Sequence, residues 1–256
     1  MPYADNAGTR IHYKVEGTGP ALVLQHGFTQ CLEDWFECGY VAGLRPKYRL
    51  ILIDARGHGG SDKPHDEASY ALDRRVADVT AVLDAVGVEK AHFWGYSMGG
   101  WIGFGMARHA PHRVDALVIG GQHPFARDQA GLRQWVRTGM TEGGDAFVGG
   151  FEKTFGPMSQ GYATRLRTAD LGAYLAAAQD RDGMEDVLGG MMMPCCVYAG
   201  EADPLFAQVK SARERIPNVR FFSLPGFSHL QAFVESSRVL RRSWSSLAPS
   251  GRATRR

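Results

Sequence analysis

The sequence contains few of the features that mark metal-binding, membrane or nucleic-acid-binding proteins. Its four cysteines include no C-x-x-C pair, and the histidines lack metal-ligand spacing, so neither a zinc site nor a redox disulfide is predicted. No Gly-Lys dipeptide occurs, which excludes a phosphate-binding P-loop. The longest uncharged run, residues 91–107, is too short and too glycine-rich for a membrane span. No basic stripe suited to nucleic acid is present in the body of the chain.

The two ends of the chain carry little information about function. The first residues lack the basic and then apolar segments of a signal peptide, so we expect a cytoplasmic protein with reduced cysteines. Residues 249–256 contain three arginines and no acid, and we predict a disordered basic tail there.

Strand-like and helix-like segments alternate along most of the 256 residues. Expected strands cover residues 9–15, 21–25, 49–54, 91–96, 114–120, 195–199 and 219–224. Expected helices cover residues 72–86, 98–108, 206–215 and 231–247. This alternation predicts an α/β fold with a mostly parallel sheet covered by helices on both faces. Functional sites in such sheets form at the carboxyl ends of the strands.

The alternation stops between residues 122 and 190, where three helix-like segments follow one another near residues 131–139, 145–155 and 162–179. We therefore predict an α/β core made of residues 1–121 and 191–248, with a helical cap over 122–190. The cap is rich in aromatic residues, namely Phe125, Trp135, Phe147, Phe151, Phe155 and Tyr162. Trp135, Phe147 and Phe151, with Phe206 of the core, are the candidate wall of a hydrophobic pocket. For each of these residues taken alone, the competing explanation is that its side chain packs the cap onto the core.

One stretch predicts a nucleophilic serine at the end of the strand over residues 91–96. Gly95-Tyr-Ser97-Met-Gly99 has the G-x-S-x-G pattern of a nucleophile elbow. A serine on such a tight strand-to-helix turn has a strained backbone, and side chains two residues away on either side would collide. The helix that begins at Met98 directs its N-terminal N–H groups toward the same place.

A serine hydroxyl needs a base to remove its proton and an acid to orient that base. The candidate base is His229, which follows the last predicted strand. The candidate acid is Asp203, which follows the preceding strand, and Glu201 is its rival. We prefer Asp203 because it lies further into the loop.

An oxyanion needs two N–H donors. The backbone of Met98 is one candidate. The other is the backbone of Phe28, which follows His26-Gly27 at a strand end. We expect His26 to brace this loop and to take no part in proton transfer.

Taken together, these motifs resemble the α/β-hydrolase fold family, specifically its serine hydrolases with a helical cap. The matching residues are His26-Gly27-Phe28, Asp54-x-Arg56-Gly57-x-Gly59-x-Ser61, Gly95-x-Ser97-x-Gly99-Gly100, Gly200-x-x-Asp203 and His229. The resemblance implies an eight-stranded sheet, a Ser97–Asp203–His229 triad, an acyl-enzyme mechanism and no cofactor. The sequence is unlike haloalkane dehalogenases and epoxide hydrolases, which use aspartate where Ser97 stands.

The resemblance favours hydrolysis of a carboxylic ester or lactone of a small hydrophobic substrate. Three alternatives stay open, namely C–C bond hydrolysis, acyl transfer or perhydrolysis on the same triad, and ligand binding without catalysis. The expected partner is the small substrate, without nucleic acid or membrane, and a homodimer is the one assembly that we consider.

Overall fold

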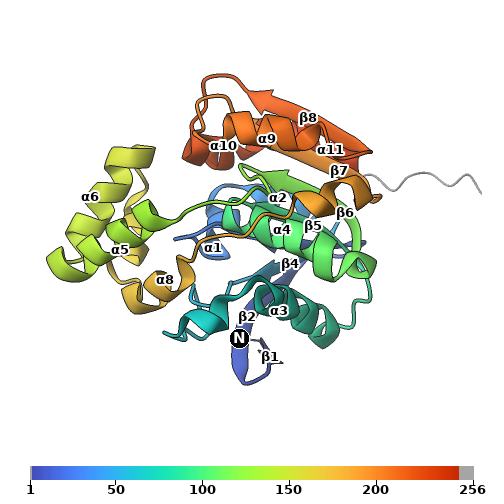
Figure 1. The fold of residues 1–256 in the computed structure, drawn as a ribbon. Coiled ribbons are helices and arrows are strands. Elements are labelled where there is room, and N and C mark those ends of the chain that lie inside the picture. Colours follow the sequence, from blue (N-terminus) through green and yellow to red (C-terminus); the bar gives the residue numbers. More distant parts are fainter. Residues whose placement is uncertain (1, 248–256) are drawn as a thin grey trace, which may run out of the picture.

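The computed structural model describes residues 2–247 and is organised around an eight-stranded sheet (Figure 1). Its strands are β1 (Tyr3–Asn6), β2 (Thr9–Glu16), β3 (Ala21–Gln25), β4 (Arg49–Ile53), β5 (Ala91–Tyr96), β6 (Val114–Gly120), β7 (Cys195–Gly200) and β8 (Val219–Leu224). They are arranged in the order β1-β2-β4-β3-β5-β6-β7-β8. Strand β2 is antiparallel to β1 and β4, and every other neighbouring pair is parallel. The predicted fold class is confirmed.

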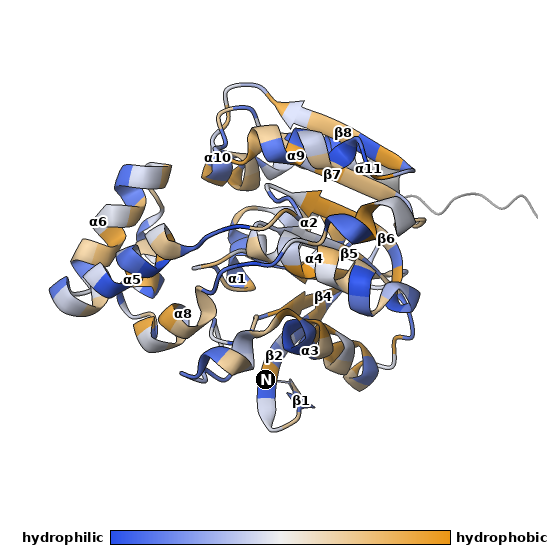
Figure 2. Ribbon diagram, viewed as in Figure 1, coloured by the Kyte–Doolittle hydropathy of each residue, from blue (hydrophilic) through white to orange (hydrophobic). Residues whose placement is uncertain are grey.

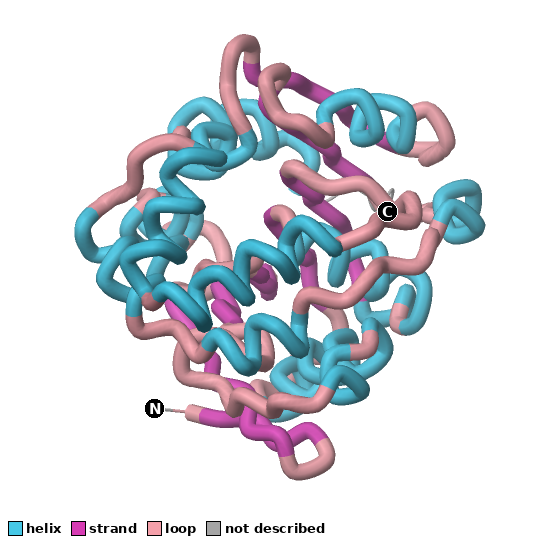
Figure 3. Tube along the Cα trace, turned by 60° about the vertical axis from the view of Figure 1, so that its left-hand side comes forward, coloured by secondary structure: helices cyan, strands magenta, loops and turns pink. Residues whose placement is uncertain are grey.

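Helices surround the strands (Figure 3). Those of the core are α1 (Glu33–Glu37), α2 (Tyr40–Leu44), α3 (Leu72–Ala85), α4 (Met98–His109), α9 (Phe206–Arg213), α10 (His229–Val234) and α11 (Ser236–Leu247). Short 3₁₀ helices η1 (Glu67–Tyr70), η2 (Pro111–Arg113) and η3 (Glu185–Gly190) lie in the connections. Within residues 2–247, no helix is long and apolar enough to cross a membrane.

The central strands β3 to β7 are buried on both faces of the sheet. Successive side chains of a strand point to opposite faces, so each strand contributes to two hydrophobic clusters. On β4, Ile51 and Ile53 pack in a hydrophobic cluster with α3, α4 and α9, whereas Leu50 and Leu52 pack in a second cluster with α1, α2, α10 and α11. The apolar residues of the strands therefore concentrate in the middle of the molecule (Figure 2). This rigid sheet fixes the positions of the loops that follow its strands.

The segment between β6 and β7 folds into four helices that stand to one side of the sheet (Figure 1). They are α5 (Ala130–Glu142), α6 (Gly144–Phe155), α7 (Gln160–Arg167) and α8 (Leu171–Ala177). They enclose a hydrophobic cluster of their own, which includes Val136, Phe147, Phe151, Tyr162 and Leu166. The role of this segment as a cap that controls access stays a prediction.

The strands predicted from the sequence form close to their expected bounds, but two predicted helices are wrong in extent. Residues 162–179 form two helices, because the Asp170 side chain accepts the N–H of Ala173 and starts α8 anew. Residues 231–247 also form two, and α10 begins earlier with Ser228 as its N-cap in a capping box. The predicted tail over 249–256 lies outside the described residues.

Candidate active site

Ser97 sits at the turn between β5 and α4 in a conformation that non-glycine residues rarely adopt, with φ 53° and ψ −113°. Glycine is needed on both sides of it. A Cβ atom on Gly95 would lie 2.1 Å from the carbonyl oxygen of Gly99, and one on Gly99 would lie 2.0 Å from that of Gln25. The steric reason for the G-x-S-x-G spacing is thus present in the structure. The turn places the Ser97 side chain beyond the end of β5.

The loops after β7 and β8 bring an acid and a base to this serine. Ser97 Oγ lies 2.9 Å from His229 Nε2, and His229 Nδ1 lies 2.6 Å from Asp203 Oδ2. The carboxylate of Asp203 is completely buried and accepts a second hydrogen bond from the N–H of Leu205. Because a carboxylate only accepts, His229 carries its proton on Nδ1 and presents the Nε2 lone pair to the serine. The geometry is that of a nucleophile, a base and an orienting acid.

Glu201, the rival acid, lies elsewhere. Its carboxylate accepts a hydrogen bond from Ser223 Oγ at 2.6 Å, and the residue is exposed. The loop after β7 turns inward only beyond Glu201, where Asp203 approaches His229. Burial and hydrogen bonding both favour Asp203 as the acid.

Two backbone segments flank the serine hydroxyl. Met98 is the first residue of α4, where an N–H has no intrahelical partner. Gly27 lies against the serine, since a Cβ atom on it would be 3.2 Å from Ser97 Cβ, and its N–H donates to Gln30 Oε1 at 2.8 Å. The adjacent backbone of Phe28 therefore lies beside the nucleophile. Its role and that of Met98 as oxyanion donors stay predictions.

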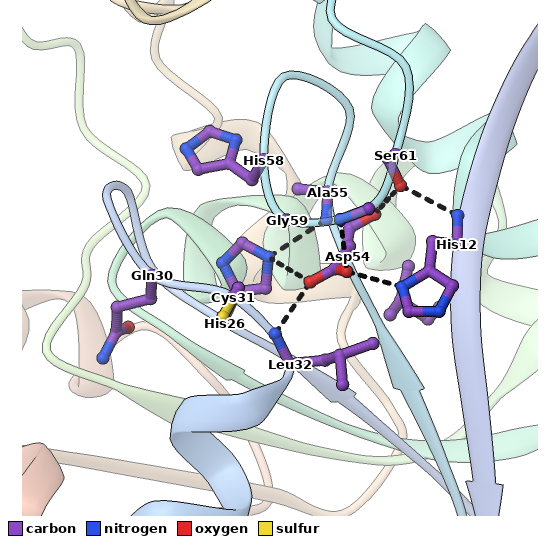
Figure 4. A network of polar contacts seen from close by, with 12 residues as sticks. His12, His26, Gln30, Cys31, Leu32, Asp54, Ala55, His58, Gly59 and Ser61 are labelled. Atoms are coloured by element: carbon purple, nitrogen blue, oxygen red, sulfur yellow. Dashed lines mark hydrogen bonds and ion pairs between the residues drawn. The ribbon is translucent and has the colours of Figure 1, made fainter. Parts of the chain in front are cut away.

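A buried polar network centred on Asp54 holds this loop in place (Figure 4). The Asp54 carboxylate accepts the N–H groups of Leu32 and Gly60, each at 2.8 Å, and binds His12 Nδ1 at 2.7 Å. Gly59 has φ 49°, and a Cβ atom there would lie 2.2 Å from this carboxylate. The turn motif after β4 thus anchors the segment that follows β3.

His26 links the same network to the loop beside Ser97 (Figure 4). Its Nε2 accepts the N–H of Ala55 at 3.0 Å, so Nδ1 carries the proton and donates to the carbonyl of Gly27 at 2.7 Å. Burial lowers the pKa of His26, which keeps the ring neutral at neutral pH. Both hydrogen bonds of His26 go to backbone groups, and Asp54 Oδ1 lies 3.9 Å from its Nε2, as suits a bracing role.

A cavity of about 380 Å³ opens beside the triad and is lined by Ser97, Asp203 and His229 together with residues of the helical segment. Trp135 and Phe151, both predicted pocket residues, lie on its wall. Phe155, Tyr162, Leu132 and Leu230 complete an apolar surface around them. The cavity therefore combines the reactive hydroxyl with a hydrophobic wall.

The two other predicted pocket residues were assigned wrongly. Phe147 is fully buried inside the helical segment, where its ring stacks on Trp135 with a centroid distance of 4.0 Å. It supports the wall from behind. Phe206 packs against the hydrophobic cluster between the sheet and α9, and the preceding Pro204 and Leu205 reach the cavity instead.

The sequence analysis also missed polar residues of the wall, including Arg127 and Arg181. They come from the two connections between core and cap, which no motif marks. A metal centre is not among the arrangements found: residues 2–247 contain no group of three or more His, Cys, Asp or Glu side chains placed to hold an ion.

His123 lies on the connection between β6 and α5. Its surroundings predict that the stability of the folded protein depends on pH. Burial, and then the nearby Arg127 and Arg181, lower the pKa of His123 to about 4, against roughly 6.5 in an unfolded chain. Between these values the unfolded state binds more protons, so the free energy of unfolding falls as pH decreases from about 6.5 to about 4. We expect the melting temperature to fall in the same window.

The His123→Asn variant tests this contribution, because the asparagine side-chain oxygen can replace Nδ1 in accepting the N–H of Phe125. Between pH 7 and pH 4, we expect the melting temperature of the variant to fall by less than that of the wild type. Equal losses in the two proteins would contradict the assignment. Burial also lowers the pKa of His26 and of His58, so the melting temperature of the variant should still fall to some extent as the pH decreases.

The sheet order, the serine elbow and the acid and base after β7 and β8 define a protein of the α/β-hydrolase fold. The family model of that fold matches residues 20–146, and the chain belongs to the α/β-hydrolase fold family. The solved structure of an enol-lactonase from Burkholderia xenovorans superposes with a TM-score of 0.85 at 22% identity, covering 96% of this chain and 99% of the other. An esterase from a Rhodococcus species superposes with a TM-score of 0.84 at 27% identity, covering 97% and 98%.

Among curated proteins, the chain is similar to a Bacillus subtilis protein named as a 2-succinyl-6-hydroxy-2,4-cyclohexadiene-1-carboxylate synthase. The two are 36% identical over 118 residues, which make up 44% of this chain and 42% of that protein. The matched segment thus spans less than half the length of this curated relative.

Proposed function

We propose that the chain is a serine hydrolase that cleaves a carboxylic ester or lactone of a small hydrophobic substrate through an acyl-enzyme on Ser97. The hydrogen-bonded series from Ser97 Oγ through His229 to Asp203 carries this proposal, because it places a base and an orienting acid beside the serine hydroxyl. The similarity to the Rhodococcus esterase over 97% of the chain supports it. Ser97 stands where the resemblance places an aspartate in epoxide hydrolases and haloalkane dehalogenases, which favours ester or lactone cleavage over those reactions.

The proposed reaction uses the three residues of the triad in turn. His229 Nε2 takes the proton of Ser97 Oγ as that oxygen attacks the substrate carbonyl carbon. The N–H groups of Met98 and Phe28 stabilise the negative charge that develops on the carbonyl oxygen. The C–O bond to the leaving alkoxide then breaks, and His229 returns the proton to it. His229 then takes a proton from a water molecule as the water oxygen attacks the acyl carbon. The bond from that carbon to Ser97 Oγ breaks, His229 returns the proton to Oγ, and the acid is released.

Asp203 acts throughout by fixing the tautomer of His229 and stabilising its cationic form. Its buried carboxylate retains one bond to the N–H of Leu205, so the acid cannot easily swing away from the histidine. The apolar wall around Trp135 and Phe151 gives the substrate a hydrophobic environment.

A panel of chain-length esters, lactones and a vinylogous diketone tests the reaction class. We expect turnover of 4-nitrophenyl butyrate with butyrate as the product, and little cleavage of the diketone. Product partition in added alcohol and in added peroxide separates hydrolysis from acyl transfer and perhydrolysis. Failure of the purified protein to turn over any ester or lactone in the panel would overturn the proposal in favour of ligand binding.

The hydrophobic wall yields a separate prediction about specificity. Trp135→Ala and Phe151→Ala should each raise KM for bulky esters by a factor that corresponds to roughly 1–3 kcal/mol per lost apolar contact. A small acetate ester, which does not reach the wall, should be nearly unaffected. Steady-state kinetics on both esters, with thermal melts, provide the measurement.

Phe147→Ala is the matched control, because Phe147 is buried behind the wall. Loss of a buried aromatic ring should lower the free energy of unfolding by about 3–5 kcal/mol and should affect small and bulky esters alike. If the Trp135 and Phe151 variants also affect both esters equally at unchanged stability, these residues do not contact the substrate.

A further inference from the structure

Two arginines lie side by side on the wall of the active-site cavity, outside the triad. Arg127 precedes α5 and Arg181 follows α8, and each backbone N–H donates to the carbonyl of the other at 2.9 Å. This bridge joins the two connections between core and cap, and both residues line the cavity beside Ser97. Like charges are therefore held together at the cavity.

Asp128 and Asp180, which are next to them along the chain, are bound to a third arginine. Both lie within ion-pair distance of Arg133, at 3.4 and 2.6 Å. Asp182, which follows Arg181, is exposed and forms no ion pair within residues 2–247. In the described part of the chain, neither Arg127 nor Arg181 forms an ion pair, and no side-chain hydrogen bond of either guanidinium is found. The protein thus neutralises Arg133 and leaves the other two positive charges uncompensated.

Arg181 also lines the cavity, and its guanidinium is held by packing. Its guanidinium stacks over the Trp101 ring at 4.8 Å, and Nη1 is buried without a hydrogen-bond partner. Burial, followed by the charges of Arg127 and Arg75, lowers the pKa of Arg181 to about 9, so it still carries its charge at neutral pH. A buried charge without a partner is costly, and an incoming anion would relieve that cost.

Arg127 is half-buried on the cavity wall, and, unlike Arg181, it has no guanidinium nitrogen among the buried polar atoms without a partner. Burial lowers the pKa of Arg127, and the carboxylate of Asp203 acts in the opposite direction. That carboxylate is already bonded to His229 and to the N–H of Leu205. Arg127 therefore keeps its donors free for a ligand in the cavity.

We propose that Arg127 binds a carboxylate group of the substrate, with the neighbouring Arg181 adding positive potential. A planar guanidinium matches a carboxylate in geometry, and a single negative charge suits one accessible arginine. The preferred substrate is then an ester or lactone with both an apolar part, facing the aromatic wall, and an anionic end. This inference rests on the proposed hydrolase function and narrows its substrate class.

Matched ester pairs test the proposal. The probes are mono-4-nitrophenyl esters of adipate, pimelate and suberate, each paired with the neutral ester in which an isopropyl group replaces the terminal carboxylate. For at least one length, we expect wild-type kcat/KM to favour the anionic ester. Arg127→Leu should reduce kcat/KM for that ester on the order of 10- to 100-fold, as loss of a charged hydrogen bond does, chiefly by raising KM. The neutral partner should change little.

Two further variants make the comparison specific. Arg127→Lys should retain part of the preference, because it keeps the charge without the fork of donors. Arg137→Leu removes the same charge from an exposed position on α5 and should leave the preference intact. A wild type that favours the neutral ester at every length, or a preference that survives Arg127→Leu, would overturn the inference while leaving the hydrolase proposal in place.

Binding measurements keep the two proposals distinguishable. If no ester is cleaved, the hydrolase proposal fails, and adipate itself becomes the probe. Millimolar adipate should raise the melting temperature of the wild type and of Arg137→Leu, but not that of Arg127→Leu. An equal response of all three proteins, or none in the wild type, would contradict the subsite. Without ligand, Arg127→Leu should melt at or above the wild-type temperature, because it removes the repulsion from Arg181 and breaks no ion pair or side-chain hydrogen bond found within residues 2–247.

Discussion

Replacing Ser97 with alanine is expected to reduce kcat for ester hydrolysis by roughly a million-fold, because a triad acts as a unit and fails when its nucleophile is lost. The substitution removes the oxygen that lies 2.9 Å from His229 Nε2 and no other bonded group. The fold should persist, since the backbone bond from Ser97 N–H to the carbonyl of Gly120 stays in place. Release of 4-nitrophenol by purified protein measures the effect.

An unchanged melting temperature is the control for this variant. Loss of activity together with unfolding would say nothing of the chemistry, so the comparison uses protein that melts as the wild type does. Turnover close to wild type by folded Ser97→Ala would exclude Ser97 as the nucleophile.

The second large effect is expected at Asp203. Asp203→Asn should lower kcat on the order of 10⁴-fold, because an amide can donate to His229 Nδ1 and so favour the tautomer that cannot accept the serine proton. Glu201→Gln is the matched control, being two residues away, exposed and bonded only to Ser223 among the contacts found. It should change kcat little. The two variants are compared on one substrate at one pH.

The opposite ranking of these two variants would move the acid to Glu201. Equal losses in both would suggest that the loop after β7 had been displaced as a whole. Thermal melts of both proteins separate that case from a specific loss at the histidine.

The arrangement of the site could be predicted from the sequence because it depends on local patterns. Ser97, Asp203 and His229 each lie in, or directly after, the loop or turn that follows a strand, and the carboxyl ends of parallel strands meet at one edge of a sheet. The glycines at 95 and 99 marked the tight turn for a steric reason that one sequence already contains. Bonds such as His229 Nδ1 to Asp203 then follow from the fold.

The pocket could not be predicted in the same way, because helical spacing does not say what a helix packs against. Phe147 and Phe151 lie one turn apart on α6, yet only Phe151 reaches the cavity. Stacking on Trp135 keeps the ring of Phe147 inside the helical segment. Which side chain faces the cavity therefore depends on contacts with residues that are distant in the sequence.

The positions of charges without an ion-pair partner could not be predicted from the sequence either, as Arg127 and Arg181 show. They are 54 residues apart in the numbering, and nothing in their local sequence distinguishes them from Arg133. Only the backbone bridge between them and the ion pairs of Arg133 make their uncompensated charge visible.

Covalent labelling tests the central assignment most directly. The intact protein is treated with a fluorophosphonate, digested and analysed by mass spectrometry, with Ser97→Ala treated in parallel. Phosphonylation of one residue, Ser97, in the wild type and of none in the variant is the predicted result. An unlabelled wild type, or a label on another residue that persists in Ser97→Ala, would contradict the account.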